Sequence, residues 1–541
     1  MAPYVRKSFL KHYIVAYLKT TDEFANIDII NMLFDSYVDS IGITRNRFDD
    51  WIDSHKKSFF EDTKTEERDY KLDNKSKLDP ELYQSALYDT LIEIYQAVEG
   101  MYHNLNTLQS RSGNQLPFTS INYGTCTSLE GRIITKALLD VSIKGIGRLH
   151  KTPIFPCGIF QYMKGVNNKL GTPNYDLYRL ALQSTAKRLY PNYANVDWSV
   201  NAGYDRSDPK TYFSTMGCRT SNGLDINGFG QLKDGRGNIC PVTIIMPTLA
   251  MEVSGEIGNK DIDEFFELLD KKIHEAKDML IERYEWICSQ SPESARFMYE
   301  NGTMEGYIPE EGIRSALKHG TIVIGQLGLA ETLQILIGTD HTTDEGMKLA
   351  KQIEQLYKDR CAEFKNEYKL NFGVYYTPAE NLCHTAMKKF QAKYGKIPKI
   401  SENEYFTNSI HVPVWEKVNP FEKIDIESQL TGYSNAGCIT YVEMPDSAKN
   451  NIDALEELVN YAMDHDIPYF AINVPNDTCL ECGYTDEIGE ECPMCGSHNI
   501  QRLRRVTGYL TGNYTTAFNL GKQQEVEMRI QHTGVSGSLE E

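Results

Sequence analysis

The sequence predicts an α/β fold followed by a small metal-binding module near the C-terminus. Between about residues 115 and 475, short apolar runs alternate with amphipathic helical patterns, as in domains built on largely parallel strands. Beyond residue 476, two closely spaced C-x-x-C pairs and a basic stretch replace that alternation. The chain has 541 residues, 41% of them hydrophobic, which is enough to bury a sizeable core.

Composition restricts the classes of function. The net charge is −19, from 75 acidic and 56 basic residues, which argues against a protein that coats nucleic acid but not against a nucleotide enzyme. No apolar run reaches the roughly 18 residues that span a bilayer, and no signal peptide is recognisable. We therefore expect a cytoplasmic protein. Of 12 cysteines, the four in the paired motifs suggest one metal site and the others suggest isolated thiols.

The first part of the chain, residues 1–110, is predicted to be helical. Apolar residues recur there at helical spacing, as in Phe9, Tyr13, Leu87 and Leu91. Residues 56–77 are strongly charged and are expected to form an exposed loop or a solvated helix face.

The central part is predicted to contain strands at residues 118–123, 153–160, 242–247, 321–327, 373–376, 438–441 and 468–473. A helix is expected over residues 261–285, with an apolar stripe formed by Phe265, Leu268, Leu269, Ile273, Ala276 and Leu280. About ten strands alternating with helices would suit a barrel, but periodicity alone does not distinguish a barrel from a doubly wound sheet.

The cysteine pairs predict a closed tetrahedral zinc site. Its ligands would be Cys479, Cys482, Cys492 and Cys495, and the glycine after each pair can adopt the unusual backbone angles of a tight knuckle. Zinc ribbons often bind nucleic acid, but the loop between the pairs is acidic. A structural clip, holding the segment that follows it, is the favoured role.

That following segment, residues 504–510, reads RRVTGYL. Taken alone, Gly508 would be a turn glycine. However, the chain resembles the anaerobic ribonucleotide reductases, in which a zinc ribbon precedes an R-x-x-G-Y-L loop carrying a radical glycine. The resemblance extends, in the family's order, over NQLPFT (114–119), KGIG (144–147), TPIFP (152–156), GTPNYD (171–176), MGCR (216–219), YTPAE (376–380) and YFTNS (405–409).

The resemblance implies a ten-stranded α/β barrel of two five-stranded halves, with a central loop bearing the active cysteine. An iron–sulfur activase using S-adenosylmethionine would take a hydrogen atom from Gly508. Cys218 would then become a transient thiyl radical that removes the ribose 3′-hydrogen. Asn238 would bind the ribose or formate. Alternatively, Asn238 has no ligand and is a turn residue in a Gly-rich hairpin.

Residues 377–380 have the chemistry of a helix start, with Thr377 as cap, Pro378 in the first turn and Glu380 at the third helical position. With Ala379, they could place a helix N-terminus against the substrate triphosphate. An ordinary cap without a ligand is the alternative.

The implied organisation is a helical region (1–110), a barrel core (111–475), a zinc ribbon (476–500), and a glycyl-radical loop with a tail (501–541). The family's second catalytic cysteine lies on an early barrel strand for which this sequence shows no match, and neither Cys126 nor Cys157 is assigned its role. We therefore expect the missing N-terminal strand to come from a companion chain. Formate, nucleotide effectors and a homodimer are also implied, with no membrane or nucleic-acid partner.

The sequence leaves three alternative functions open. Another glycyl-radical enzyme, of the formate-lyase or dehydratase type, is disfavoured because those relatives lack a zinc ribbon before the radical glycine. A zinc-ribbon nucleic-acid binder is disfavoured by the net charge of −19. An inactive reductase fragment would retain the fold only.

Overall fold

The structure is a computed structural model that describes residues 2–20, 80–107, 117–506, 508–511 and 513–532. Contacts divide the chain into two compact units. The first comprises residues 1–117, 123–153 and 165–184, and the second comprises residues 118–122, 154–164 and 185–541. The four segments expected from the sequence stay a prediction.

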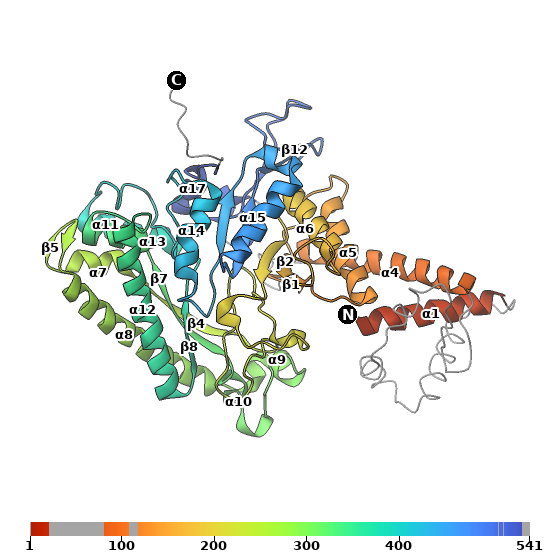
Figure 1. The fold of residues 1–541 in the computed structure, drawn as a ribbon, viewed down its shortest axis with the longest axis horizontal. Coiled ribbons are helices and arrows are strands. Elements are labelled where there is room, and N and C mark those ends of the chain that lie inside the picture. The colour runs from red at the N-terminus through yellow and green to blue at the C-terminus, as the bar shows by residue number, and fades with distance from the viewer. Residues whose placement is uncertain (1, 21–79, 108–116, 507, 512, 533–541) are drawn as a thin grey trace. The chain divides into compact units, whose positions relative to one another are not determined.

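The first unit is helical. It contains α1 (Ala2–Thr20), α4 (Pro80–Thr107) and α5 (Leu129–Lys144), while α6 (Tyr175–Arg188) begins in it and ends in the second unit (Figure 1). Helix α1 packs on α4 through a small core that includes Phe9 and Tyr13. The helices expected at the start and end of residues 1–110 are thus confirmed, while the charged stretch 56–77 and residues 114–116 lie outside the described part.

A five-stranded sheet has the order β1-β2-β3-β10-β9. Strand β2 is parallel to β3 and β9 is parallel to β10, whereas β3 and β10 are antiparallel. All residues of β2, β3 and β10 are buried, so these strands position their side chains inside the protein. The five strands are β1 (Ser120–Tyr123), β2 (Cys157–Tyr162), β3 (Asn192–Asn195), β9 (Thr440–Glu443) and β10 (Tyr469–Asn473).

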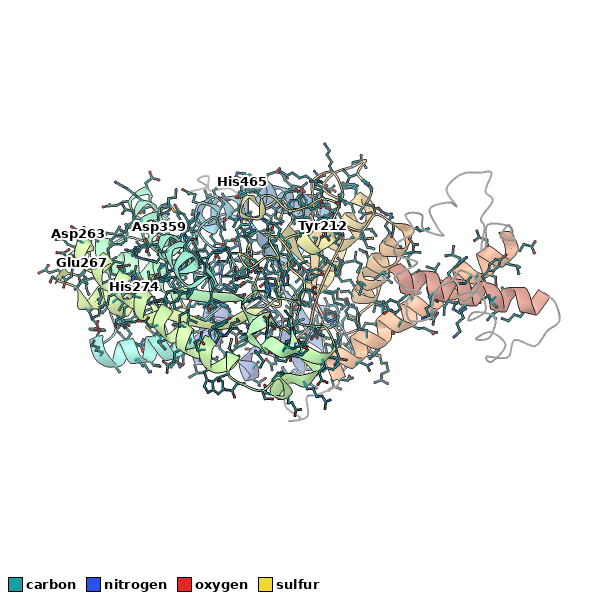
Figure 2. The ribbon with its side chains drawn as sticks, turned by 90° about the horizontal axis from the view of Figure 1, so that it is seen from below. Tyr212, Asp263, Glu267, His274, Asp359 and His465 are labelled. Carbon is teal, nitrogen blue, oxygen red and sulfur yellow. The ribbon has the colours of Figure 1, made fainter. Side chains whose placement is uncertain are left out.

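A second, wholly parallel sheet has the order β4-β7-β8, formed by β4 (Asn238–Ile245), β7 (Thr321–Leu327) and β8 (Asn371–Tyr375). Helix α8 (Ile262–Cys288) packs on β4 and helix α12 (Asp344–Tyr368) packs on β8 (Figure 1). The Asp261 side chain caps α8 by accepting a bond from the Glu264 amide. On the outer side of α8, Asp263 and Glu267 project into solvent (Figure 2).

The remaining elements of the second unit connect these sheets or follow them. The helices are α7 (Met246–Glu252), α9 (Arg296–Glu300), α10 (Arg314–Leu317), α11 (Leu329–Ile337), α13 (Leu382–Tyr394), α14 (Pro420–Thr431), α15 (Ile452–Asp464), α16 (Tyr514–Ala517) and α17 (Leu520–Glu527). Strands β5 (Gly255–Glu256) and β6 (Asn259–Lys260) form a hairpin. Short 3₁₀ helices lie at Ser199–Asn201, Pro209–Thr211, Pro292–Ala295, Pro309–Glu311 and Asp446–Asn450.

Each of the predicted strand runs overlaps an observed strand, and the expected helix over 261–285 is confirmed. Its stripe is buried except for Leu268, which is partly exposed. Strand β3 was not predicted. Mixed α/β architecture is therefore observed, while closure into a ten-stranded barrel stays a prediction. Among the described helices, none is both long and apolar enough to span a bilayer.

Candidate functional site

Four cysteine sulfurs converge near the C-terminus. The Sγ atoms of Cys479, Cys482, Cys492 and Cys495 all lie within 4.8 Å of one another. The Cys479–Cys495 and Cys482–Cys492 sulfur pairs are each 3.6 Å apart. Four ligands at about 2.3 Å around a tetrahedral zinc ion would be separated by about 3.8 Å, so the cluster has the right size for one.

Each knuckle of this cluster closes on a glycine, as expected. Gly483 has φ 80° and Gly496 has φ 69°, a region that residues with a β-carbon rarely adopt. The cluster lies on a three-stranded antiparallel sheet of order β12-β11-β13, formed by β11 (Asn476–Cys479), β12 (Thr485–Asp486) and β13 (Ile500–Leu503).

A buried carboxylate connects this module to the segment that follows it. The side chain of Asp477, on β11, is fully buried and pairs with Arg504, which follows β13. The same carboxylate accepts a 3.3 Å hydrogen bond from Arg502 of β13. Because both arginines lie immediately before the loop 505–510, the module fixes where that loop begins.

The loop itself is closed by an antiparallel bridge between Arg505 and Leu510 and carries Gly508, which is buried. A β-carbon at Gly508 would collide with the carbonyl oxygen, the carbonyl carbon and the Cα of Cys218, all backbone atoms that cannot rotate away. Only glycine fits at this position, and two of the predicted catalytic residues are in direct contact.

Cys218 lies in a tight turn closed by a bridge between Met216 and Thr220. Gly217, just before it, has φ 57°. Burial is the main cause that raises the pKa of the Cys218 thiol, which keeps the sulfur protonated at neutral pH. The sulfur lies 4.0 Å from the hydroxyl of Tyr375, at the end of β8.

The predicted substrate segment reaches the same loop. The Tyr509 hydroxyl donates a 3.1 Å hydrogen bond to the carboxylate of Glu380. This contact brings the turn formed by residues 377–380 beside Gly508.

The expected helix start at Thr377 is wrong. Helix α13 begins at Leu382, and Thr377 instead accepts a bond from the amide of Ala379. Ala379 has φ 51° and Glu380 has φ 28°, so neither can belong to a right-handed helix. Pro378 therefore lies in a turn that precedes the helix.

Asn238 is not brought to this site by any described contact with Cys218 or Gly508. It is the first residue of β4 and pairs in register with Thr321, the first residue of β7. Thr321 pairs in turn with Asn371, the first residue of β8. Tyr375 is the last residue of β8, so Asn238 and Tyr375 lie at opposite ends of this parallel sheet. Both polar side-chain atoms of Asn238 are buried without a hydrogen-bond partner within the described structure.

Cys157, which sequence reasoning left without a role, lies at the centre of the site. It is the first residue of β2, and its sulfur lies 3.6 Å from the Gly217 carbonyl oxygen and 4.0 Å from that of Gly508. Burial raises the pKa of its thiol. No motif in the sequence marks it, because its neighbours come from distant segments.

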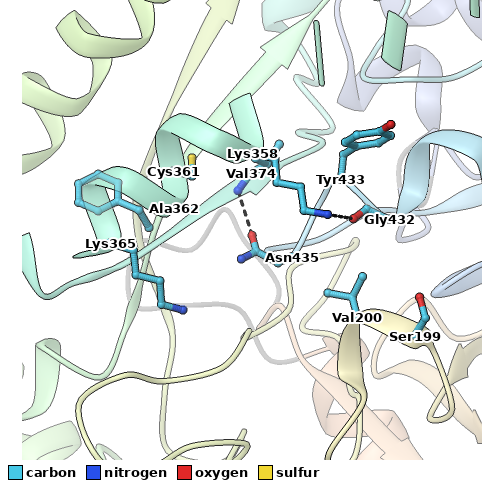
Figure 3. Close-up of a pocket in the computed structure, with 11 residues that line it drawn as sticks. Ser199, Val200, Lys358, Cys361, Ala362, Lys365, Val374, Gly432, Tyr433 and Asn435 are labelled. Carbon is cyan, nitrogen blue, oxygen red and sulfur yellow. Dashed lines mark hydrogen bonds between the residues drawn. The ribbon is translucent and has the colours of Figure 1, made fainter. Parts of the chain in front are cut away.

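A separate cavity of about 460 Å³ lies between α12 and the loop after α14. Figure 3 shows Lys358 directed at the Gly432 carbonyl and Asn435 bonded to the Val374 amide. None of the predicted site residues lines this cavity, so it does not belong to the site around Gly508.

The chain is similar to known proteins over most of its length. A profile of the family "Anaerobic ribonucleoside-triphosphate reductase" matches residues 1–532. The Escherichia coli K12 protein of that name is 35% identical over 459 residues, which cover 82% of this chain and 62% of the relative. The protein of that name from enterobacteria phage T4 is 34% identical over 453 residues, covering 81% of this chain and 72% of the relative.

Among solved structures, the anaerobic ribonucleotide reductase of Thermotoga maritima with dATP bound in its specificity site superimposes with a TM-score of 0.59. The match covers 80% of this chain and 69% of that one, at 19% identity, and therefore supports the fold alone. The chain spans about three fifths of the length of the E. coli relative, since the match covers 62% of it. From the profile match over almost its whole length, the chain belongs to the anaerobic ribonucleoside-triphosphate reductase family.

Proposed function

We propose that this chain reduces ribonucleoside triphosphates to deoxyribonucleoside triphosphates, with a glycyl radical on Gly508 and a transient thiyl radical on Cys218. The observation that carries the proposal is the packing of Gly508 on the backbone of Cys218, which leaves no room for a β-carbon. Two residues widely separated in the sequence meet there: a glycine, whose Cα carries only hydrogen atoms, and a cysteine, whose thiol can give up a hydrogen atom.

Glycine suits a stored radical because a Cα radical is conjugated with both flanking amides and needs a planar centre. Transfer to Cys218 breaks its S–H bond and restores the Cα–H bond of Gly508, leaving a sulfur radical. The thiol must be protonated for that step, and its raised pKa keeps it so. The thiyl radical then takes the ribose 3′-hydrogen, which weakens the 2′ carbon–oxygen bond.

The overall reaction consumes one formate as the two-electron reductant. Ribonucleoside triphosphate, formate and one proton give deoxyribonucleoside triphosphate, water and carbon dioxide. We assign substrate contacts to Asn238 and to the turn formed by Thr377, Pro378, Ala379 and Glu380. The 3.1 Å hydrogen bond from Tyr509 to Glu380 supports the assignment of this turn, because it brings the turn beside Gly508.

Zinc is proposed for the four-cysteine cluster, whose sulfur separations fit a tetrahedral ion. A closed Cys₄ site leaves no position for substrate, so its role would be to fold the module and hold β13 and the loop 505–510. We further propose an activating enzyme that uses S-adenosylmethionine and a 4Fe–4S cluster, together with nucleotide effectors, a homodimer, a ten-stranded barrel and a cytoplasmic location.

Electron paramagnetic resonance tests the proposal. After anaerobic incubation with the activase, reductant and S-adenosylmethionine, the chain should give a doublet that collapses to a singlet when its glycines carry deuterium at Cα. Gly508→Ala should abolish the doublet. Gly489→Ala is the matched control, because nothing lies within 4 Å of a β-carbon at that position, and it should keep the signal. If the activated chain shows no radical, or converts no CTP in the presence of formate, even after the expected companion chain is added, the proposal is wrong.

A further inference from the structure

The carbonyl oxygen of Gly508 is held by two strong donors. Nη1 of Arg505 and Nδ2 of Asn192 each donate a 3.1 Å hydrogen bond to it. One donor comes from the loop itself and the other from the first residue of β3. The carbonyl is therefore fixed from two independent elements.

Arg505 is a buried cation whose partners are neutral oxygens. Its side chain is 1% exposed, donates to Asn473 Oδ1 at 2.8 Å and to the Leu189 carbonyl, and lies over the ring of Tyr190. Among the described residues, no carboxylate pairs with it directly. Since an arginine stays charged even when buried, its field acts on the groups it touches, including the Gly508 carbonyl.

Asn192 is equally buried and has a fixed orientation. Its Nδ2 also donates to the Tyr469 hydroxyl at 2.6 Å, and residues of β3 pair with β2 and with β10. A side chain held by strand pairing and by two acceptors has little freedom to leave the Gly508 oxygen.

These contacts have a chemical consequence if Gly508 carries a radical, so the inference rests on the proposed function. A Cα radical shares its unpaired electron with the adjacent carbonyl, and electron density rises at the carbonyl oxygen. A positive charge and a second donor at that oxygen stabilise the delocalised form and keep the carbonyl in the plane of the radical.

We propose that Arg505 and Asn192 are positioning residues that stabilise the Gly508 radical through its carbonyl oxygen. No bond forms or breaks at either side chain. Both act on how long the radical persists and on how its spin is distributed, and neither contributes to the reduction of the sugar.

Asn192→Asp tests this, because it keeps the size of the side chain while removing the donor. Asn195→Asp is the matched control: Asn195 also lies on β3, is equally buried, and donates to the Met463 carbonyl instead. We expect Asn192→Asp to lower the radical content per chain by about tenfold or more, the factor that losing such a hydrogen bond gives. Its remaining doublet should be wider, because more spin stays at Cα, whereas the control should match wild type.

Arg505→Lys gives a second comparison should Asn192→Asp fail to fold, as judged by melting temperature and zinc content. A third measurement needs no variant: electron–nuclear double resonance on wild-type protein exchanged into H₂O or D₂O buffer should show exchangeable side-chain protons coupled to the radical, besides the backbone amide protons beside Gly508. A wild-type radical with no such protons, or folded variants with the wild-type splitting and yield, would overturn the inference. A wild-type chain with no radical at all would instead refute the proposed function.

Discussion

The Cα of Gly508 packs against the backbone of Cys218 so tightly that no side chain could replace the hydrogen between them. This contact brings a loop that follows the cysteine module onto a turn in the centre of the chain. If Gly508 stores a radical that Cys218 accepts, this contact is where the two residues exchange a hydrogen atom.

Cys218→Ser should separate radical storage from turnover. The variant lacks the weak S–H bond needed to accept the radical, whereas Gly508 is unaltered. We expect the glycyl doublet at a wild-type level and no deoxynucleotide product. Cys288→Ser, a partly buried cysteine outside the site, should retain both. Turnover by Cys218→Ser would rule out the thiyl step.

Removing a cysteine ligand should release the metal and loosen the loop. We expect about one zinc ion per wild-type chain and much less in Cys495→Ser, measured by elemental analysis of protein purified without added metal. Cys126→Ser removes an exposed thiol outside the cluster and should keep the zinc. Equal zinc content in the two variants would contradict the site.

Asp477→Asn should weaken the contacts that connect the four-cysteine module to the loop 505–510. The substitution removes the buried charge that pairs with Arg504 and binds Arg502. A loss of about 1–3 kcal/mol would speed hydrogen exchange of residues 500–510 by about five- to 150-fold. Asp359→Asn, at an exposed position on α12, should leave exchange unchanged, and equal protection in both variants would argue against the coupling.

Between about pH 4.5 and pH 8, a core carboxyl group on α12 should contribute a loss of stability. Burial raises the pKa of Glu354, on α12, from 4.5 to about 8, although Gln326 donates a hydrogen bond to it. A group whose folded pKa is raised stabilises the fold fully below its unfolded pKa, and loses that contribution as the pH rises through the folded value.

Glu354→Gln mimics the protonated form and should flatten this part of the profile of melting temperature against pH. The exposed Glu367→Gln, on the same helix, should follow the wild-type profile. If Glu354→Gln kept the full loss of stability towards pH 8, the carboxyl would not be its source.

Several elements could be predicted because their signals are local. Helix α8 has a capping Asp261 and a stripe at helical spacing, and β7 coincides with the predicted run over residues 321–327. The cysteine cluster follows from its spacing alone. Gly508 and Cys218 were identified by resemblance, and the structure brings the two together.

Other features depend on contacts between distant segments. Strand β3 has the sequence NYAN, which lacks apolar alternation, and it is a strand because β2 and β10 pair with it. The positions of Asn192 and Cys157 beside the Gly508 carbonyl arise from contacts between distant segments, which no local pattern encodes. At Thr377 the local helix-start rule was satisfied, but positive φ angles at Ala379 and Glu380 override it.

The most direct test of the account is exposure of the activated chain to air, followed by mass spectrometry. Oxygen adds to a glycyl radical and cleaves the backbone there. The account predicts a truncation at Gly508, dependent on prior activation and absent from a chain kept without S-adenosylmethionine. An activated chain that remained intact in air, or broke at another residue, would contradict a radical at Gly508.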